Sequence, residues 1–276
     1  MCRIMSLAFT SEKSNLVDLF IDAFIKASRY DPYLERLSSE ASHGDGWGIA
    51  SISFQDNKPH VYYYKSADPV YTDTSEKTLK SIVNDLKKHD YSLVIIHARK
   101  ASSSEPVGEK YSHPFYIEVD GLKAWFIHNG SADKKILGDK LGLDPRKHVD
   151  SELLGKLLVL EIDKCVRSGG VIQDCVYRAY SVSKEYILEK SALNTSLLIS
   201  RNTWCELYTS HWVKNPGNDA RREYYSIIAY ETRGFTASGS ITIKNYLPGD
   251  VKAMIKVLEP GIYKLTPEGI SRIFNL

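Results

Sequence analysis

The chain opens with Met1-Cys2-Arg3-Ile4-Met5-Ser6-Leu7-Ala8-Phe9-Thr10, which places a cysteine directly behind the first methionine. The apolar residues of 1–10 alternate well enough to predict a β-strand that starts at Cys2. Removal of Met1 would give Cys2 a free α-amino group, with a pKa near ~8, beside its thiol. Such an amine can take the thiol proton, so the stretch suggests an N-terminal nucleophile that acts on an amide. A cysteine at position 2 can equally be an inert residue that starts a strand, and a retained Met1 would block the chemistry.

The composition is that of a globular protein. The 276 residues are 43% hydrophobic and 25% charged, and the net charge of +2 argues against nucleic acid or an anionic membrane as a partner. We expect no signal peptide and no membrane-spanning segment. The four cysteines, Cys2, Cys165, Cys175 and Cys205, have no disulfide-framework spacing. They predict a reduced, cytoplasmic protein.

Hydrophobic periodicity predicts the elements outward from this first strand. Helices are expected over 15–29, from Asp31-Pro32, over 74–88, from Asp150 or Ser151 as N-cap, and over 174–190. Strands are expected over 49–54, 61–64, 93–96, 124–127, 196–200, 204–210, 224–229, 241–243 and 262–265. No linker or repeat divides the chain. The pattern predicts an α+β fold with helices stacked on antiparallel sheets.

Two predicted strands end in polar residues, where functional sites tend to lie. One runs into His97-Ala98-Arg99 and the other into His128-Asn129-Gly130. The glycine-rich stretch His43-Gly44-Asp45-Gly46-Trp47-Gly48 permits positive φ and close backbone approach. The simpler interpretations are solvated strand ends and a tight turn whose Trp47 fills the core.

Taken in order, these motifs resemble those of the class II (N-terminal cysteine) glutamine amidotransferases, most closely their small single-domain branch. The matching residues are Met1-Cys2, the His43–Gly48 stretch, His97-Ala-Arg99, Ser112-His-Pro-Phe115, His128-Asn-Gly130 and Asp150-Ser-Glu152. The resemblance implies a four-layer αββα sandwich of two antiparallel sheets, as in the Ntn hydrolases. It implies one domain over 1–276, with the motifs in 1–155 and with 156–276 completing the sandwich.

The resemblance also implies roles for single residues. Cys2 would form a thioester with a glutamine or γ-glutamyl side-chain amide, and Asn129 with the Gly130 N–H would form the oxyanion hole. Arg99 would hold the substrate carboxylate and Asp150 its ammonium, while Trp47 and Gly48 would line the pocket. His97, His113 and His128 would supply supporting hydrogen bonds. No metal or other cofactor is implied, and Arg3 stands where the large synthase-type members usually have glycine.

Several alternatives stay open. The chain could be a stand-alone hydrolase for a small-molecule substrate, an ammonia-donating subunit for a separate synthetase, or a catalytically silent binding module. A metal site from His43, Asp45, His97, His113 and His128 lacks close i, i+3 or i, i+4 pairs. Specificity for the leaving group is expected in loops 100–113 and 211–222. The leaving group and the oligomeric state are not indicated by the sequence.

Overall fold

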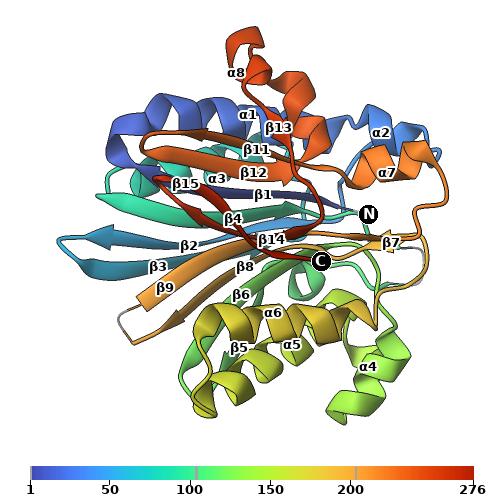
Figure 1. Ribbon diagram of the computed structural model, residues 1–276. Helices are drawn as coiled ribbons and strands as arrows, with labels where there is room; N and C mark the ends of the chain where they lie inside the picture. The colour runs from blue at the N-terminus through green and yellow to red at the C-terminus, as the bar shows by residue number, and fades with distance from the viewer. Residues whose placement is uncertain (1, 103–104, 203) are drawn as a thin grey trace.

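Two antiparallel sheets stacked face to face form the centre of the molecule, and helices cover the outer face of each (Figure 1). The structure is a computed structural model that describes residues 2–102, 105–202 and 204–276. The helices α1 and α3 lie on one sheet, and α5 and α6 lie on the other. This arrangement confirms the predicted four-layer αββα sandwich.

The first sheet has seven strands and the second has six, with a separate two-stranded pairing at one end. In spatial order the first sheet contains β13 (Lys256–Val257), β11 (Ile227–Thr232), β12 (Phe235–Ser240), β1 (Arg3–Thr10), β4 (Tyr91–Ala98), β2 (Trp47–Gln55) and β3 (Lys58–Ser66). The second contains β15 (Gly269–Asn275), β14 (Gly261–Thr266), β9 (Trp204–His211), β8 (Asn194–Arg201), β6 (Leu122–Asn129) and β5 (Phe115–Val119). The small pairing joins β10 (Val213–Lys214) to β7 (Ser191–Ala192).

The helices connect and cover these strands. The α-helices are α1 (Ser14–Arg29), α2 (Pro32–Glu35), α3 (Asp73–Leu86), α4 (Lys134–Leu141), α5 (Asp150–Arg167), α6 (Ile172–Lys184), α7 (Asp219–Tyr225) and α8 (Gly249–Ala253). The 3₁₀ turns are η1 (Ser11–Lys13), η2 (Glu109–Tyr111), η3 (Pro145–Lys147) and η4 (Ile241–Tyr246). None of the helices in the described part of the chain is long and apolar enough to cross a bilayer.

Strand β1 is apolar on both faces because both faces are covered. Its residues Met5, Leu7 and Phe9 join the core beneath α1 and α3, whereas Ile4 and Ala8 join the core between the sheets. A strand buried on both sides needs such a nearly continuous apolar run. Burial and its two partners, β12 and β4, fix β1 in the middle of the sheet, with Cys2 at its beginning.

Both halves of the chain build the sandwich. Residues after 155 supply β8, β9, β14 and β15 to the second sheet and β11, β12 and β13 to the first. In each sheet the strands of the two halves lie side by side in two blocks, which meet where β12 pairs with β1 and where β8 pairs with β6. The division of the chain into domains stays a prediction.

Three predicted elements differ from the structure. The predicted strand 241–243 is wrong, because these residues form η4, where Thr242 turns to donate to Asp31 at 2.8 Å. The predicted strand 224–229 begins late, because Tyr224 and Tyr225 end α7 instead. The predicted helix 174–190 ends at Lys184. In the first two cases tertiary contacts outweigh the strand propensity of β-branched or aromatic residues.

The expectation that all cysteines are reduced is also wrong. Cys165 and Cys175 form a disulfide between the end of α5 and the first turn of α6, with Cα atoms 5.4 Å apart. The turn at Gly169-Gly170 folds α6 back on α5, and a Cβ at Gly170 would lie 2.6 Å from either sulfur. Chain reversal, rather than a spacing motif, brings the two cysteines together. The cytoplasmic location stays a prediction, and reduced cysteines no longer support it.

Candidate active site

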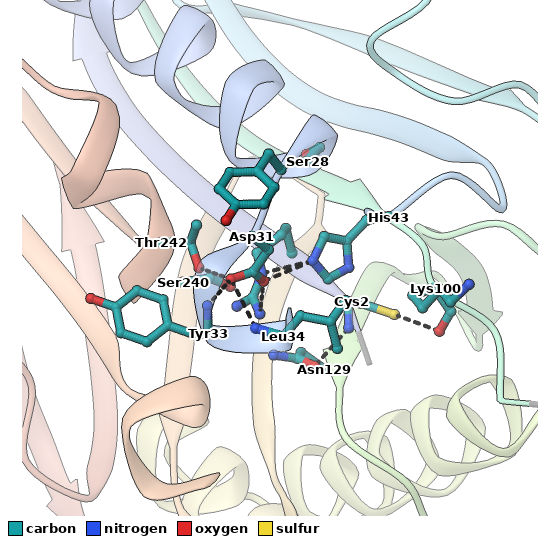
Figure 2. A network of polar contacts seen from close by, with 12 residues as sticks. Cys2, Ser28, Asp31, Tyr33, Leu34, His43, Lys100, Asn129, Ser240 and Thr242 are labelled. Atoms are coloured by element: carbon teal, nitrogen blue, oxygen red, sulfur yellow. Dashed lines mark hydrogen bonds and ion pairs between the residues drawn. The ribbon is translucent and has the colours of Figure 1, made fainter. Parts of the chain in front are cut away.

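Cys2 is buried at the beginning of β1, facing the ends of strands from both sheets. Its backbone nitrogen donates to Asn129 Oδ1 at 2.9 Å, and its Sγ lies 3.7 Å from the Lys100 carbonyl oxygen (Figure 2). Asn129 ends β6 in the second sheet, and Lys100 follows β4 in the first. Cys2, which directly precedes β1, therefore lies where the two sheets meet.

The environment of Cys2 favours the thiolate. Burial by itself raises the pKa of the Cys2 thiol. The positive charge of the chain's amino terminus and the neighbouring His97 outweigh burial and lower that pKa to about 6. A thiol with this pKa is largely ionised at neutral pH and is a reactive nucleophile.

The other free cysteine has the opposite properties. Cys205 lies in a cavity at the far end of β1, where Thr10, Tyr91 and Lys264 also line the wall. Burial and then the negative charge of Glu206 raise the pKa of the Cys205 thiol to about 11. Of the two free cysteines in the described residues, only Cys2 has a lowered thiol pKa.

Asn129 has one amide atom engaged and one available. Its Oδ1 accepts from the Cys2 nitrogen, while its Nδ2 is buried and has no hydrogen-bond partner in the described part of the chain. An unpaired buried donor is costly, so such a group is usually matched to a ligand or a water molecule. The orientation that binds the Cys2 nitrogen thus leaves the amide N–H groups available for an oxygen placed near Cys2.

Gly130 is required by a close backbone approach. A Cβ at this position would lie 1.9 Å from the Ala192 carbonyl oxygen, closer than any side chain permits. Gly48 is similar, since its Cβ would lie 2.3 Å from the His113 carbonyl oxygen. Both predicted site glycines therefore sit where two chain segments touch.

Arg99 is held at the same edge by the glycine-rich stretch. Its N–H donates to the Gly46 carbonyl at 2.8 Å, and its carbonyl accepts from Asp45 at 2.9 Å. In the sheet, Ala98 pairs with both Arg3 and Trp47, so Arg99 follows a strand that lies beside the nucleophile strand. The Arg99 side chain is buried, and within 2–102, 105–202 and 204–276 its Nη1 has no partner.

Asp150 is the first residue of α5, and its side chain binds the backbone that follows β6. Its Oδ2 accepts from the Ala132 N–H at 2.9 Å, and its Oδ1 accepts from the Ser151 N–H at 2.7 Å. A carboxylate in the first turn of a helix is favoured by the helix dipole. The N-cap is Val149, which makes no side-chain cap, so the expected N-cap role of Asp150 or Ser151 is wrong. Asp150 is held in place by backbone donors.

Trp47 is fully buried in the core that underlies α1, where its ring lies 5.2 Å from that of Tyr64. Trp47 therefore fills the core, as one of the two interpretations of the sequence predicted. Its contact with a substrate stays a prediction.

A buried ionic network behind Cys2 was not predicted from the sequence. Arg3 forms an ion pair with Asp31, and its Nε donates to His43 Nε2 at 3.1 Å. The Arg3 guanidinium also lies 4.2 Å from the centre of the Tyr224 ring. Burial raises the pKa of Asp31, but the Arg3 charge outweighs it and holds that pKa well below its usual range. This network accounts for arginine beside the nucleophile.

The only local signal for this network was the Asp31-Pro32 helix start. Asp31 does cap α2, because its Oδ1 accepts from the Tyr33 and Leu34 N–H groups (Figure 2). Its pairing with Arg3 and Thr242 joins three distant segments. In the described residues, no group of three or more His, Cys, Asp or Glu side chains is placed to hold a metal ion.

Comparisons with known proteins agree with this geometry. The family model for class-II glutamine amidotransferases matches residues 15–182, more than half of the 276-residue chain, in a range that begins after Cys2. No curated protein matches the sequence.

Among solved structures, the allosteric regulatory enzyme of purine biosynthesis matches with a TM-score of 0.54 and 14% identity. That match covers 98% of this chain and 49% of the other, so the chain spans about half the length of that enzyme. A predicted glutamine amidotransferase from Pseudomonas aeruginosa matches with a TM-score of 0.35 and 15% identity, over 87% of this chain and 80% of the other. The likeness to the purine-biosynthesis enzyme shows a shared fold, and the family match assigns the chemistry. The chain belongs to the class-II glutamine amidotransferases and is an enzyme that acts on an amide C–N bond.

Proposed function

We propose that this enzyme hydrolyses the side-chain amide of glutamine or of a γ-glutamyl compound through a thioester on Cys2. The observation that carries the proposal is Asn129, which binds the Cys2 nitrogen through Oδ1 and leaves Nδ2 buried without a partner in the described chain. A donor next to a nucleophile is what a developing oxyanion requires. One such donor typically contributes about 3 kcal/mol to transition-state stabilisation.

The reaction would proceed in two steps. The Cys2 thiolate attacks the amide carbon, and the oxyanion is bound by Asn129 Nδ2 and the Gly130 N–H. The Cys2 α-amino group gives a proton to the leaving nitrogen as the C–N bond breaks, which leaves a thioester. The same amine then takes a proton from water, whose hydroxide releases glutamate and restores the thiolate. The scheme needs a freed Cys2 α-amino group, and Met1 lies outside the described residues.

The head group of the substrate would be held by two oppositely charged residues. We assign the α-carboxylate to Arg99, whose buried guanidinium has an unpaired Nη1 in the described structure and can form a bidentate pair. We assign the α-ammonium to Asp150, and we place Trp47, Gly48 and His97 around them. This assignment leaves the γ-carbonyl near Cys2 and leaves the amine part of the substrate open.

A second candidate is an ammonia-donating subunit that works with a separate synthetase. The observation in its favour is that the chain matches about half of the purine-biosynthesis enzyme. A third candidate, a silent binding module on the same fold, predicts that the thiol does not react with a substrate-like electrophile. We also propose that residues 1–276 form one domain, since both sheets contain strands from both halves, joined by the β12–β1 and β8–β6 pairings.

The test is intact mass before and after exposure to a diazo-ketone analogue of glutamine. We expect loss of Met1 and a single adduct that maps to Cys2, with no adduct on Cys2→Ala. Glutamate release from glutamine and from a γ-glutamyl amide would then be measured with and without candidate synthetases. A processed protein that forms no adduct and releases no glutamate would contradict the proposal, and acceleration by a synthetase would support the subunit role.

A further inference from the structure

Arg3 holds the start of β1 from the side that faces away from the other sheet. Side chains alternate along a strand, so Ile4 points between the two sheets, whereas Arg3 and Met5 point toward the helices that cover the first sheet. The Arg3 side chain is completely buried on that side and does not reach a substrate bound beside Cys2. Its influence on the position of Cys2 therefore passes through the peptide bond that joins the two residues.

The partner of Arg3 is itself fixed on several sides. Arg3 forms an ion pair with Asp31, and its Nε lies 3.1 Å from His43 Nε2. Asp31 Oδ1 accepts from two N–H groups at the start of α2 and from Thr242 Oγ1 at 2.8 Å (Figure 2). The Asp31 N–H donates to the Ala41 carbonyl oxygen at 2.7 Å. The ion pair thus ties β1 to α2, to η4 and to the segment that leads into the glycine-rich stretch.

An aromatic ring completes the binding site of the guanidinium. The Arg3 guanidinium lies 4.2 Å from the centre of the Tyr224 ring, which is a cation–π distance. Tyr224 is fully buried and belongs to α7. A planar guanidinium can stack on this ring and pair with the Asp31 carboxylate at the same time, which the compact ammonium group of lysine cannot do.

A nucleophile at the beginning of a chain needs such an anchor. The first residues of most domains are poorly ordered unless other contacts hold them in place. Two hydrogen bonds hold the backbone here, from the Cys2 N–H to Asn129 Oδ1 at 2.9 Å and from the Ile4 N–H to Ser240 Oγ at 3.1 Å. Fraying of the strand would also separate the ion pair behind it. Separation would leave a buried carboxylate without its counter-charge, which is strongly unfavourable.

We propose that Arg3 is a positioning residue that, with Asp31 as its anchor, fixes Cys2 where its thiol meets the substrate carbonyl and its nitrogen meets Asn129. This inference rests on the proposed role of Cys2 as nucleophile. Rates of reactions between positioned groups fall about 100-fold for a displacement of about 1 Å. Loss of the anchor therefore slows the chemical step.

Substrate binding should respond differently, because the head group is assigned to other residues, Arg99 and Asp150. The experiment measures adduct formation at Cys2 against the concentration of the diazo-ketone analogue of glutamine, on protein whose Met1 removal is verified by mass. It gives a maximal rate and a half-saturating concentration. Arg3→Gln and Asp31→Asn should each lower the maximal rate about tenfold or more and change the half-saturating concentration less than about threefold.

The double variant, Arg3→Gln with Asp31→Asn, tests whether the two residues act as a pair. Its rate loss should be smaller than the product of the two single losses, because each single variant already breaks the same contact. It also removes both buried charges together, so it serves as the test if a single variant fails to fold. A double variant with the original maximal rate overturns the inference, as do single losses that simply multiply.

The matched control is Arg201→Gln. Arg201 forms an ion pair with the buried Asp163 at 2.6 Å, at the opposite end of β8 from Asn194, which pairs with Asn129. This variant should lower the melting temperature and keep the maximal rate of adduct formation. An equal loss of rate in Arg201→Gln and Arg3→Gln would mean that Arg3 contributes only to stability, and would overturn the inference.

Hydrogen exchange at the Ile4 amide supplies a measurement that needs no reaction at Cys2. We expect this amide to be protected in the unchanged protein and to exchange about tenfold faster or more in the double variant. Exchange in the unchanged protein at the rate of an unfolded chain would overturn the inference. An unchanged protein that forms no adduct, but shows this protection and its loss in the double variant, would support the anchor and contradict the proposed function.

Discussion

At the scale of single residues, a variant of Arg99 should affect substrate binding more than the chemical step. Its guanidinium is buried with an Nη1 that lacks a partner in the described chain, and Lys cannot reproduce the planar pair of donors. We predict that Arg99→Lys raises KM for glutamine about 10- to 100-fold and changes kcat much less, because the lost contact forms before the reaction. Steady-state kinetics of glutamate release will measure this.

The matched control is Arg272→Lys, since Arg272 is exposed on the edge strand β15. That variant should keep the original kinetic constants. An unchanged KM for Arg99→Lys would show that another residue holds the substrate carboxylate.

At the scale of elements, the backbone just after β6 lies in close contact with the end of β7. Gly130 makes this possible, since a Cβ there would lie 1.9 Å from the Ala192 carbonyl oxygen. We predict that Gly130→Ala separates the two segments, lowers stability by about 1–3 kcal/mol and displaces Asn129 from Cys2. Thermal unfolding and the rate of adduct formation at Cys2 will measure the two effects.

Gly249→Ala is the matched glycine control, because nothing lies within 4 Å of a Cβ at the beginning of α8. It should keep both the melting temperature and the reactivity of Cys2. Equal behaviour of the two glycine variants would mean that the β6–β7 contact can relax freely.

At the scale of the whole molecule, buried neutral histidines make the fold sensitive to acid. Burial lowers the pKa of His211 from 6.5 to about 4. The unfolded chain therefore binds a proton below about pH 6.5, and the folded chain does so only below about pH 4. The contribution of His211 is complete above pH 6.5 and is lost as the pH falls toward 4, by up to about 3 kcal/mol.

We predict that His211→Gln loses less stability between pH 7 and pH 4.5 than the unchanged protein, as measured by urea unfolding at both values. His60→Gln, at an exposed position on the edge strand β3, should retain the full pH dependence. If the His211 and His60 variants behaved alike, the acid sensitivity would have to come from other groups.

The sequence predicted those features that depend on local pattern. Apolar alternation and helical spacing indicated β1, α1 and β4. The family resemblance predicted a shared site for Cys2, Arg99 and Asn129, and their roles stay predictions. The sequence could not predict contacts between distant segments, because no local pattern marks them. The Arg3–Asp31 pair, the Cys165–Cys175 bond and the turn at Thr242 all depend on how the finished sheets and helices meet.

The central position of β1 also determines when, during synthesis, this strand can pair on both sides. Its partner β4 ends at Ala98, but its other partner, β12, begins at Phe235, roughly 225 residues after β1 ends. At about 5–20 residues per second, synthesis of that interval takes roughly 10–45 s. Until then β1 cannot be paired on both sides, and Cys2 is accessible to an aminopeptidase. Afterwards Cys2 is buried at the start of a central strand, so we predict that the cleavage required by the proposed mechanism takes place on the nascent chain.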